Sequence, residues 1–253
     1  MSEPKSGDMP ILEHLEELRW RIIKILIALT IATIAAYFFS NTLFKWIRWP
    51  LDAATPGKTI NLNYLRIGEG FTIRLKLSLL AGILISIPVT IFHIWRFVMP
   101  GLYSHERKKI IPIVFWSSFL FIVGCSMCFF WVMPFTIRFL LAIAPENVVP
   151  VLTVDEYINF VMWTTLAFGF VFQLPLIALF LGRLGIVNSK MLSKGRRYAI
   201  VGIAIVAAVV TPSTDAFTMT MLGLPLYLLY EVSIWLLKFS SWERSRAREK
   251  LAG

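Results

Sequence analysis

The stretch Ile110–Phe135, IIPIVFWSSFLFIVGCSMCFFWVMPF, runs for 26 residues without a charged side chain. A helix of that length reaches about 39 Å, more than the roughly 30 Å thickness of a bilayer's hydrocarbon core. The rest of the chain is similar, because 57% of its 253 residues are apolar and only 16% are charged, against about 25% charged in soluble domains. The sequence therefore predicts an all-α integral membrane protein that forms a single domain over residues 1–253.

Apolar stretches of this kind recur along the chain and predict six spans. Their ranges are 22–39, 77–95, 110–135, 157–182, 198–210 and 216–237. The last two are short: residues 198–210 reach only about 20 Å, and Glu231 interrupts the sixth stretch. Two interpretations of this pair, which residues 211–215 join, stay open. It is a re-entrant hairpin, or it is two true spans that thin the bilayer beside them.

The distribution of positive charge predicts the orientation. The chain has 25 Lys and Arg against 15 Asp and Glu, a net charge of +10. With the N-terminus inside and six crossings, 18 basic residues lie inside and seven outside. The positive-inside rule then predicts two cytoplasmic termini, residues 1–21 as an amphipathic segment and 239–253 as a tail. Because basic loops explain the excess charge, we expect no nucleic-acid partner.

The first outside loop, residues 40–70, departs from this rule because it is basic. Its composition combines aromatic residues with prolines and a glycine, namely Trp46, Trp49, Pro50, Pro56 and Gly57. This mixture is typical of a folded cap with aromatic side chains at the membrane interface.

Ionisable residues are scarce inside the predicted spans, where Glu231 is the only acid. A proton-coupled carrier normally relays charge through buried acids or histidines near the midplane, so a small-molecule transporter or channel is the weaker alternative. His14, His93 and His105 lie on separate elements without metal-ligand spacing, and no nucleophile constellation accompanies them. We therefore expect no enzyme, no metal site and no cofactor.

Acidic residues gather instead on the predicted cytoplasmic side. Glu13 and Glu17 are four residues apart and share one face of an N-terminal helix. A solvated acidic face is the plain interpretation, and a guanidinium-binding surface is the functional one, because carboxylates hold planar Arg groups in bidentate geometry. Glu106 adds a carboxylate on the same side, although a charged turn between helices would also place it there.

A buried amide, Gln173, lies near the centre of the fourth predicted span and is followed by Pro175. An amide in hydrocarbon needs a hydrogen-bond partner, which is either another helix of this chain or a helix of a second protein. Prolines within the spans predict a kinked rather than straight bundle.

Four stretches of the chain resemble the hallmarks of the twin-arginine translocase C subunit (TatC) family. They are His14–Arg19, Pro88–Lys108, Phe168–Pro175 and Thr211–Asp215, in the family's order and over nearly the whole chain. The resemblance implies a six-span receptor with cytoplasmic termini, a folded first extracytoplasmic loop and two short final helices, in the plasma or inner membrane. It also implies twin-arginine signal peptides of folded proteins as ligands, and small single-span subunits of the TatA and TatB type as partners in homo- and hetero-oligomers. Export would be driven by the proton-motive force.

The same resemblance implies roles for single residues. Glu17 and Glu106 would hold the arginine pair of the signal peptide, and Arg19 and Phe97 would line or shape that site.

Further positions carry structural or docking roles by the same resemblance. Gln173 would meet a polar residue of a partner helix; many family members have Glu there, so this chain can only hydrogen-bond. Pro50 would support the outer cap, Pro88 and Pro175 would shape their helices, and Asp215 would close the outer end of the short pair.

Overall fold

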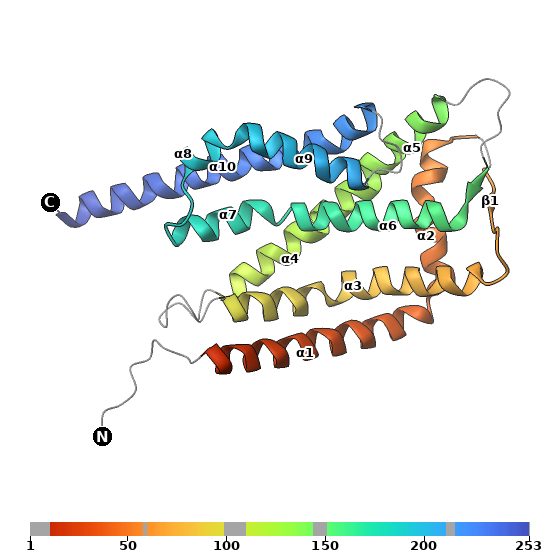
Figure 1. The fold of residues 1–253 in the computed structure, drawn as a ribbon, viewed down its shortest axis with the longest axis horizontal. Coiled ribbons are helices and arrows are strands. Elements are labelled where there is room, and N and C mark those ends of the chain that lie inside the picture. Colours follow the sequence, from red (N-terminus) through yellow and green to blue (C-terminus); the bar gives the residue numbers. More distant parts are fainter. Residues whose placement is uncertain (1–10, 58–59, 99–109, 144–150, 211–215, 253) are drawn as a thin grey trace. The chain divides into compact units, whose positions relative to one another are not determined.

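The computed structural model describes residues 11–57, 60–98, 110–143, 151–210 and 216–252. Nearly all of them are helical (Figure 1): α1 Ile11–Tyr37, α2 Ser40–Ala54, α3 Glu69–Val98, α4 Ile110–Met127, a π-helical turn Cys128–Val132, α5 Met133–Ala142, α6 Val154–Val171, α7 Leu174–Arg183, α8 Ser189–Lys194, α9 Arg196–Val210 and α10 Ala216–Ala252. Two short strands, β1 Leu62–Asn63 and β2 Leu152–Thr153, pair in parallel, with Leu62 opposite Leu152. The predicted all-α class is confirmed.

Within the described residues, five helical segments are long and apolar enough to cross a membrane. They are Glu13–Tyr37, Glu69–Val98, Ile111–Ala142, Val154–Gly182 and Ala216–Phe239, and each overlaps a predicted span. The chain is thus a multi-pass membrane protein. Helix α9 has 15 residues, fewer than the ~20 of an ordinary span, so the sixth crossing and the orientation of the termini stay predictions.

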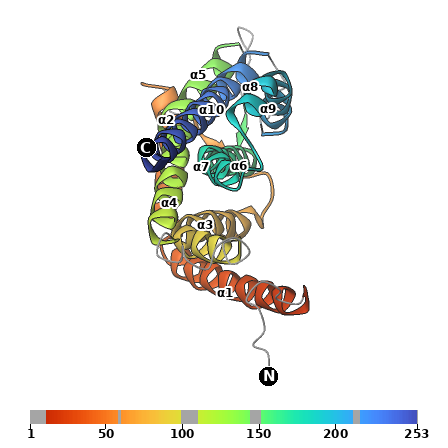
Figure 2. The ribbon, with the colours of Figure 1, turned by 90° about the vertical axis from the view of Figure 1, so that its left-hand side faces the viewer.

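The chain divides into two compact units. The first comprises Met1–Trp46 and Ile67–Phe119, and the second Ile47–Arg66 and Leu120–Gly253. In the first unit α1 lies along α3, as both views show (Figures 1 and 2). A buried hydrogen bond of 3.0 Å from Trp95 Nε1 to Ser117 Oγ joins α3 to α4 in the same unit.

Small residues set how closely the helices approach. A Cβ atom on Gly82 of α3 would lie 2.9 Å from the backbone nitrogen of Thr33 on α1. In the second unit, a Cβ on Gly169 of α6 would lie 2.7 Å from Sγ of Cys125 on α4. Van der Waals contact is a main source of helix association in lipid, so these glycines allow the contacts that hold each unit together.

Two of the prolines in the spans stand where helical geometry changes. Pro134 follows the π-helical turn, in which the Met133 N–H donates to the Cys128 carbonyl. Pro175 lies in the first turn of α7, directly after the break that separates α6 from α7. Pro88 is different, because α3 continues through it from Glu69 to Val98.

We predict that Gly82→Ala lowers the free energy of unfolding by about 1–3 kcal/mol, because the new methyl group overpacks the contact with the α1 backbone. Thermal unfolding of the purified protein, followed by tryptophan fluorescence, measures the change. Gly202→Ala on α9 is the matched control, since a Cβ there meets nothing within 4 Å. Equal stability of the two variants would contradict the close α1–α3 contact.

Candidate functional site

The N-terminal end of α1 meets the C-terminal end of α3 through two aromatic rings. The imidazole of His14 stacks on the phenyl ring of Phe97, with centroids 4.3 Å apart and planes 9° from parallel. Both side chains are half-buried. The contact brings Phe97 beside the acidic stretch of α1, although the two are far apart in the sequence.

A carboxylate lies next to this ring pair. Arg21 donates to Glu17 Oε1 through Nε at 3.1 Å and also through Nη2. Glu17 Oε2 lies 3.8 Å from His14 Nδ1, which is too long for a hydrogen bond. This oxygen is buried and accepts no hydrogen bond within the described part of the chain.

The unfilled oxygen gives the site its chemistry. A buried carboxylate oxygen without a donor costs free energy that an incoming N–H group would recover. The flat ring pair beside it offers a face on which a planar cation can stack. An acceptor oxygen next to an aromatic face suits a guanidinium group.

The structure brings some of the predicted site residues together and leaves others apart. Glu17 and Phe97 are both in contact with His14. Arg19 is exposed, and two positions along a helix turn its side chain about 200° away from Glu17. Glu106 and Asp215 lie outside the described residues.

Sequence reasoning did not include His14 and Arg21 in the site. Arg21 follows Glu17 by four residues, the spacing of a helical ion pair, which is the signal that could have identified it. His14 precedes Glu17 by three residues on the same face.

Gln173 occupies the break between α6 and α7, where it is the N-cap residue of α7. Its backbone N–H donates to Phe170 O at 3.0 Å, and its carbonyl accepts from Ile177 N at 2.9 Å. The backbone is therefore satisfied through a tightened turn although Pro175 supplies no N–H. The Gln173 side chain is half-buried, and Pro175 is buried.

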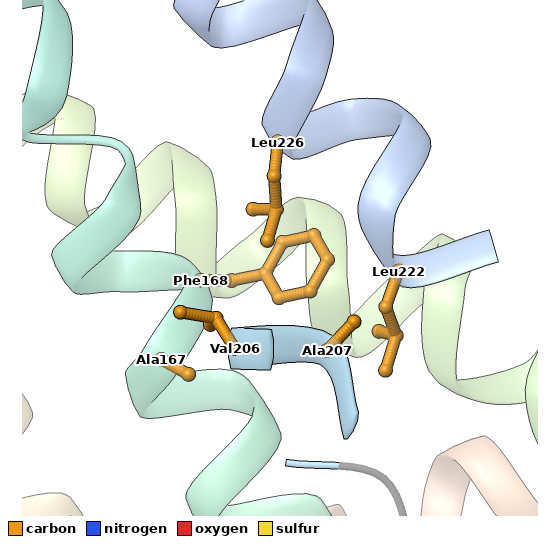
Figure 3. Close-up of a pocket in the computed structure, with 6 residues that line it drawn as sticks. All are labelled: Ala167, Phe168, Val206, Ala207, Leu222 and Leu226. Atoms are coloured by element: carbon orange, nitrogen blue, oxygen red, sulfur yellow. The ribbon is translucent and has the colours of Figure 1, made fainter. Parts of the chain in front are cut away.

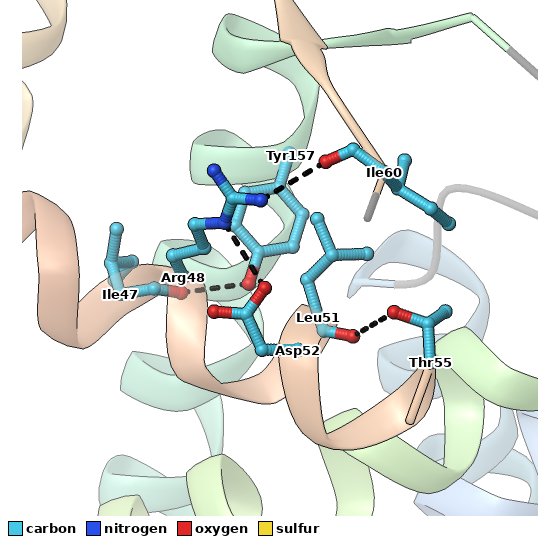
Figure 4. Close-up of polar contacts among 7 residues, drawn as sticks. All are labelled: Ile47, Arg48, Leu51, Asp52, Thr55, Ile60 and Tyr157. Atoms are coloured by element: carbon cyan, nitrogen blue, oxygen red, sulfur yellow. Dashed lines mark hydrogen bonds and ion pairs between the residues drawn. The ribbon is translucent and has the colours of Figure 1, made fainter. Parts of the chain in front are cut away.

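The predicted cap contains a polar network at the end of α2 (Figure 4). Tyr157 Oη donates to the Ile47 carbonyl at 2.7 Å. Arg48 Nε contacts Asp52 Oδ1 at 3.0 Å, and its Nη2 donates to Ile60 O at 3.2 Å. Pro50 is buried on the same helix. These bonds tie the segment before β1 to the start of α6, so this loop is folded.

The acid predicted within a span, Glu231, is paired. Arg196, at the start of α9, donates from Nε at 2.6 Å and from Nη2 at 3.0 Å to its two oxygens, and Tyr227 Oη donates at 3.0 Å. The hydrogen bonds with Glu231 raise the pKa of the Arg196 guanidinium above its ordinary value. The pair fixes the first turn of α9 to α10.

A small pocket lies between three helices of the second unit (Figure 3). Its lining consists of apolar side chains from α6, α9 and α10, namely Ala167, Phe168, Val206, Ala207, Leu222 and Leu226. Ligand sites normally include a few polar groups that orient the ligand. None of the six lining side chains supplies one, so this pocket is a packing gap.

Comparison with known proteins gives a consistent family. The profile of the family described as "Sec-independent protein translocase protein (TatC)" matches residues 13–225. The chain is 39% identical to the protein of that name from Desulforapulum autotrophicum, over 89% of this chain and 83% of the relative. It is 35% identical to the Aquifex aeolicus protein, over 95% of this chain and 100% of the relative. With the Escherichia coli protein the identity is 32%, over 91% and 88%.

A solved structure shares the fold. The crystal structure of a twin-arginine translocase receptor, TatC, superposes with a TM-score of 0.81 at 35% sequence identity. The match covers 90% of this chain and 99% of that structure.

We predict that Tyr157→Phe lowers the free energy of unfolding by about 1 kcal/mol, because the buried hydrogen bond to the Ile47 carbonyl is lost while ring packing is kept. Thermal unfolding measures the change. Tyr198→Phe is the control, since that ring is 75% exposed. A shift of the same size in both variants would remove the Tyr157 contact as a cause.

Proposed function

The chain belongs to the Sec-independent protein translocase (TatC) family, and on that premise we propose how it acts as the receptor of twin-arginine protein translocation. It is a multi-pass membrane protein and a translocase component, not an enzyme. We propose that it lies in the plasma or inner membrane with both termini in the cytoplasm, as the distribution of basic residues favours.

Recognition of the signal peptide centres on the cytoplasmic end of α1. One arginine of the pair binds Glu17 Oε2 and stacks against the His14–Phe97 rings, and Glu106 binds the other arginine. The observation that carries this proposal is the buried Glu17 oxygen without a donor, next to a stacked aromatic pair. Each charge-assisted contact contributes about 1.5–3 kcal/mol. Two are needed because anionic lipid headgroups compete for the same guanidinium groups.

Partner subunits complete the translocase. We propose that small single-span subunits of the TatA and TatB type dock near Gln173, in homo- and hetero-oligomers, and that the proton-motive force drives export. The break between α6 and α7 supports this role, because it puts a polar amide at the centre of an otherwise apolar span. Within a bilayer such an amide favours a polar partner on a neighbouring helix.

We predict that Glu106→Ala blocks export of a folded reporter carrying an Arg-Arg signal, and that Glu17→Ala reduces it somewhat less. Loss of one contact is expected to weaken signal-peptide binding about tenfold or more. Export into the periplasm or medium, measured by reporter fractionation, is the readout. Membrane insertion of each variant is checked in parallel by immunoblot.

Glu16→Ala is the matched control, since Glu16 is an exposed acid beside Glu17 on the same helix. It is expected to export normally. Normal export by the Glu17→Ala, Glu106→Ala double variant would refute the proposed site.

We predict that inserting about five leucines into α9, enough to reach an ordinary span, impairs export because the bilayer is then no longer thinned locally. The length-matched control replaces five exposed α9 residues by leucine without insertion: Ile200, Val201, Ile205, Val206 and Val209. Undiminished export by the lengthened variant would show that the short helix has no role in transport.

A further inference from the structure

Arg21 is an arginine of this chain that already occupies the proposed binding carboxylate. Its side chain is only 10% exposed, and two of its nitrogens donate to Glu17 Oε1. An incoming arginine therefore meets a carboxylate that is half-occupied by another guanidinium group.

The surroundings of this pair are cationic. Arg21, Lys24 and Arg96 are all near enough to His93 on α3 to act on it electrostatically. Glu17 and Arg21 together carry no net charge, so the pair attracts a cation much less than a lone carboxylate would. Binding at this point depends on the geometry of the free oxygen more than on net charge.

We propose that Arg21 is the residue that makes the site discriminate arginine from lysine in the signal peptide. This inference rests on the proposed function. With Oε1 taken by Arg21, the site offers a single oxygen beside a flat ring pair. A guanidinium group is planar and weakly hydrated, so it can share that oxygen and stack on the rings.

A lysine ammonium fits the same place poorly. It is a compact and strongly hydrated charge, and it needs strong compensating charge before it gives up water. The neutral Glu17–Arg21 pair does not supply that charge. Without Arg21, both Glu17 oxygens would carry an uncompensated negative charge and would attract either cation.

The experiment compares signal peptides on the full chain in nanodiscs of one lipid composition. Fluorescent peptides that carry Arg-Arg or Lys-Lys are titrated against the unaltered chain and against Arg21→Gln, and fluorescence anisotropy gives the two dissociation constants. We expect the preference for Arg-Arg over Lys-Lys to fall about tenfold in Arg21→Gln, chiefly because Lys-Lys binds more tightly.

Two control variants separate geometry from overall charge. Lys24→Gln removes one positive charge from the same helix and is expected to keep the preference, because Lys24 does not donate to Glu17 in the contacts that hold Arg21. Arg21→Lys keeps the pair neutral and is expected to leave Lys-Lys binding weak. Arg21→Met repeats the test with an apolar side chain of similar length.

Several results would overturn the proposal. One is an unchanged preference in both Arg21→Gln and Arg21→Met; another is a fall that comes only from weaker Arg-Arg binding, which marks a positioning role. An equal effect of Lys24→Gln would indicate general charge, and failure of both Arg21 variants to fold would make Arg21 structural.

Glu17→Ala distinguishes this failure from failure of the proposed function. If Glu17→Ala leaves Arg-Arg binding intact, the binding site itself is wrong. If Glu17→Ala weakens Arg-Arg binding and the Arg21 variants keep the preference, only the role of Arg21 is wrong.

Discussion

Hydrocarbon supplies no hydrogen bonds, so each backbone polar group of a span must find its partner inside the protein. This constraint explains why the described spans are helical and why their irregular points are repaired locally. At the π-helical turn the Met133 N–H reaches back to Cys128 O, and at the α6–α7 break the Gln173 N–H donates to Phe170 O. Proline can stand at such points because neighbouring groups take over the missing bond. The break in turn brings an amide side chain to the middle of a span.

Helix association follows from the same environment. Lipid tails are as apolar as leucine, so close contact between helices matters more than hydrophobic burial. Gly82 and Gly169 allow this approach in the two units. Polar contacts are concentrated near helix ends, where Glu17 pairs with Arg21 and Arg196 pairs with Glu231. These pairs share a motif but differ in occupancy: both oxygens of Glu231 accept hydrogen bonds, whereas only one oxygen of Glu17 does. A receptor site needs such an unfilled group, and a structural clamp does not.

Much of the architecture was predictable because it depends on consecutive residues. Length and apolarity located five helical segments that the structure also contains, and the mixed composition of residues 40–70 indicated a folded loop. The ends of the helices were less predictable. Helix α3 begins at Glu69 and α10 continues well past the apolar stretch, because polar residues extend a helix beyond the membrane without changing the apolar pattern.

The sequence by itself determined the class of protein, the approximate spans and the acidic face of α1, because each of these follows from the order and period of side chains along one segment. Only the tertiary structure decided which groups meet at that face. Phe97 reaches His14 because α3 packs along α1, and no local pattern encodes that contact. The choice of Arg21 over Arg19 as the partner of Glu17 depends on the angle between side chains on a helix and on which face is buried against α3.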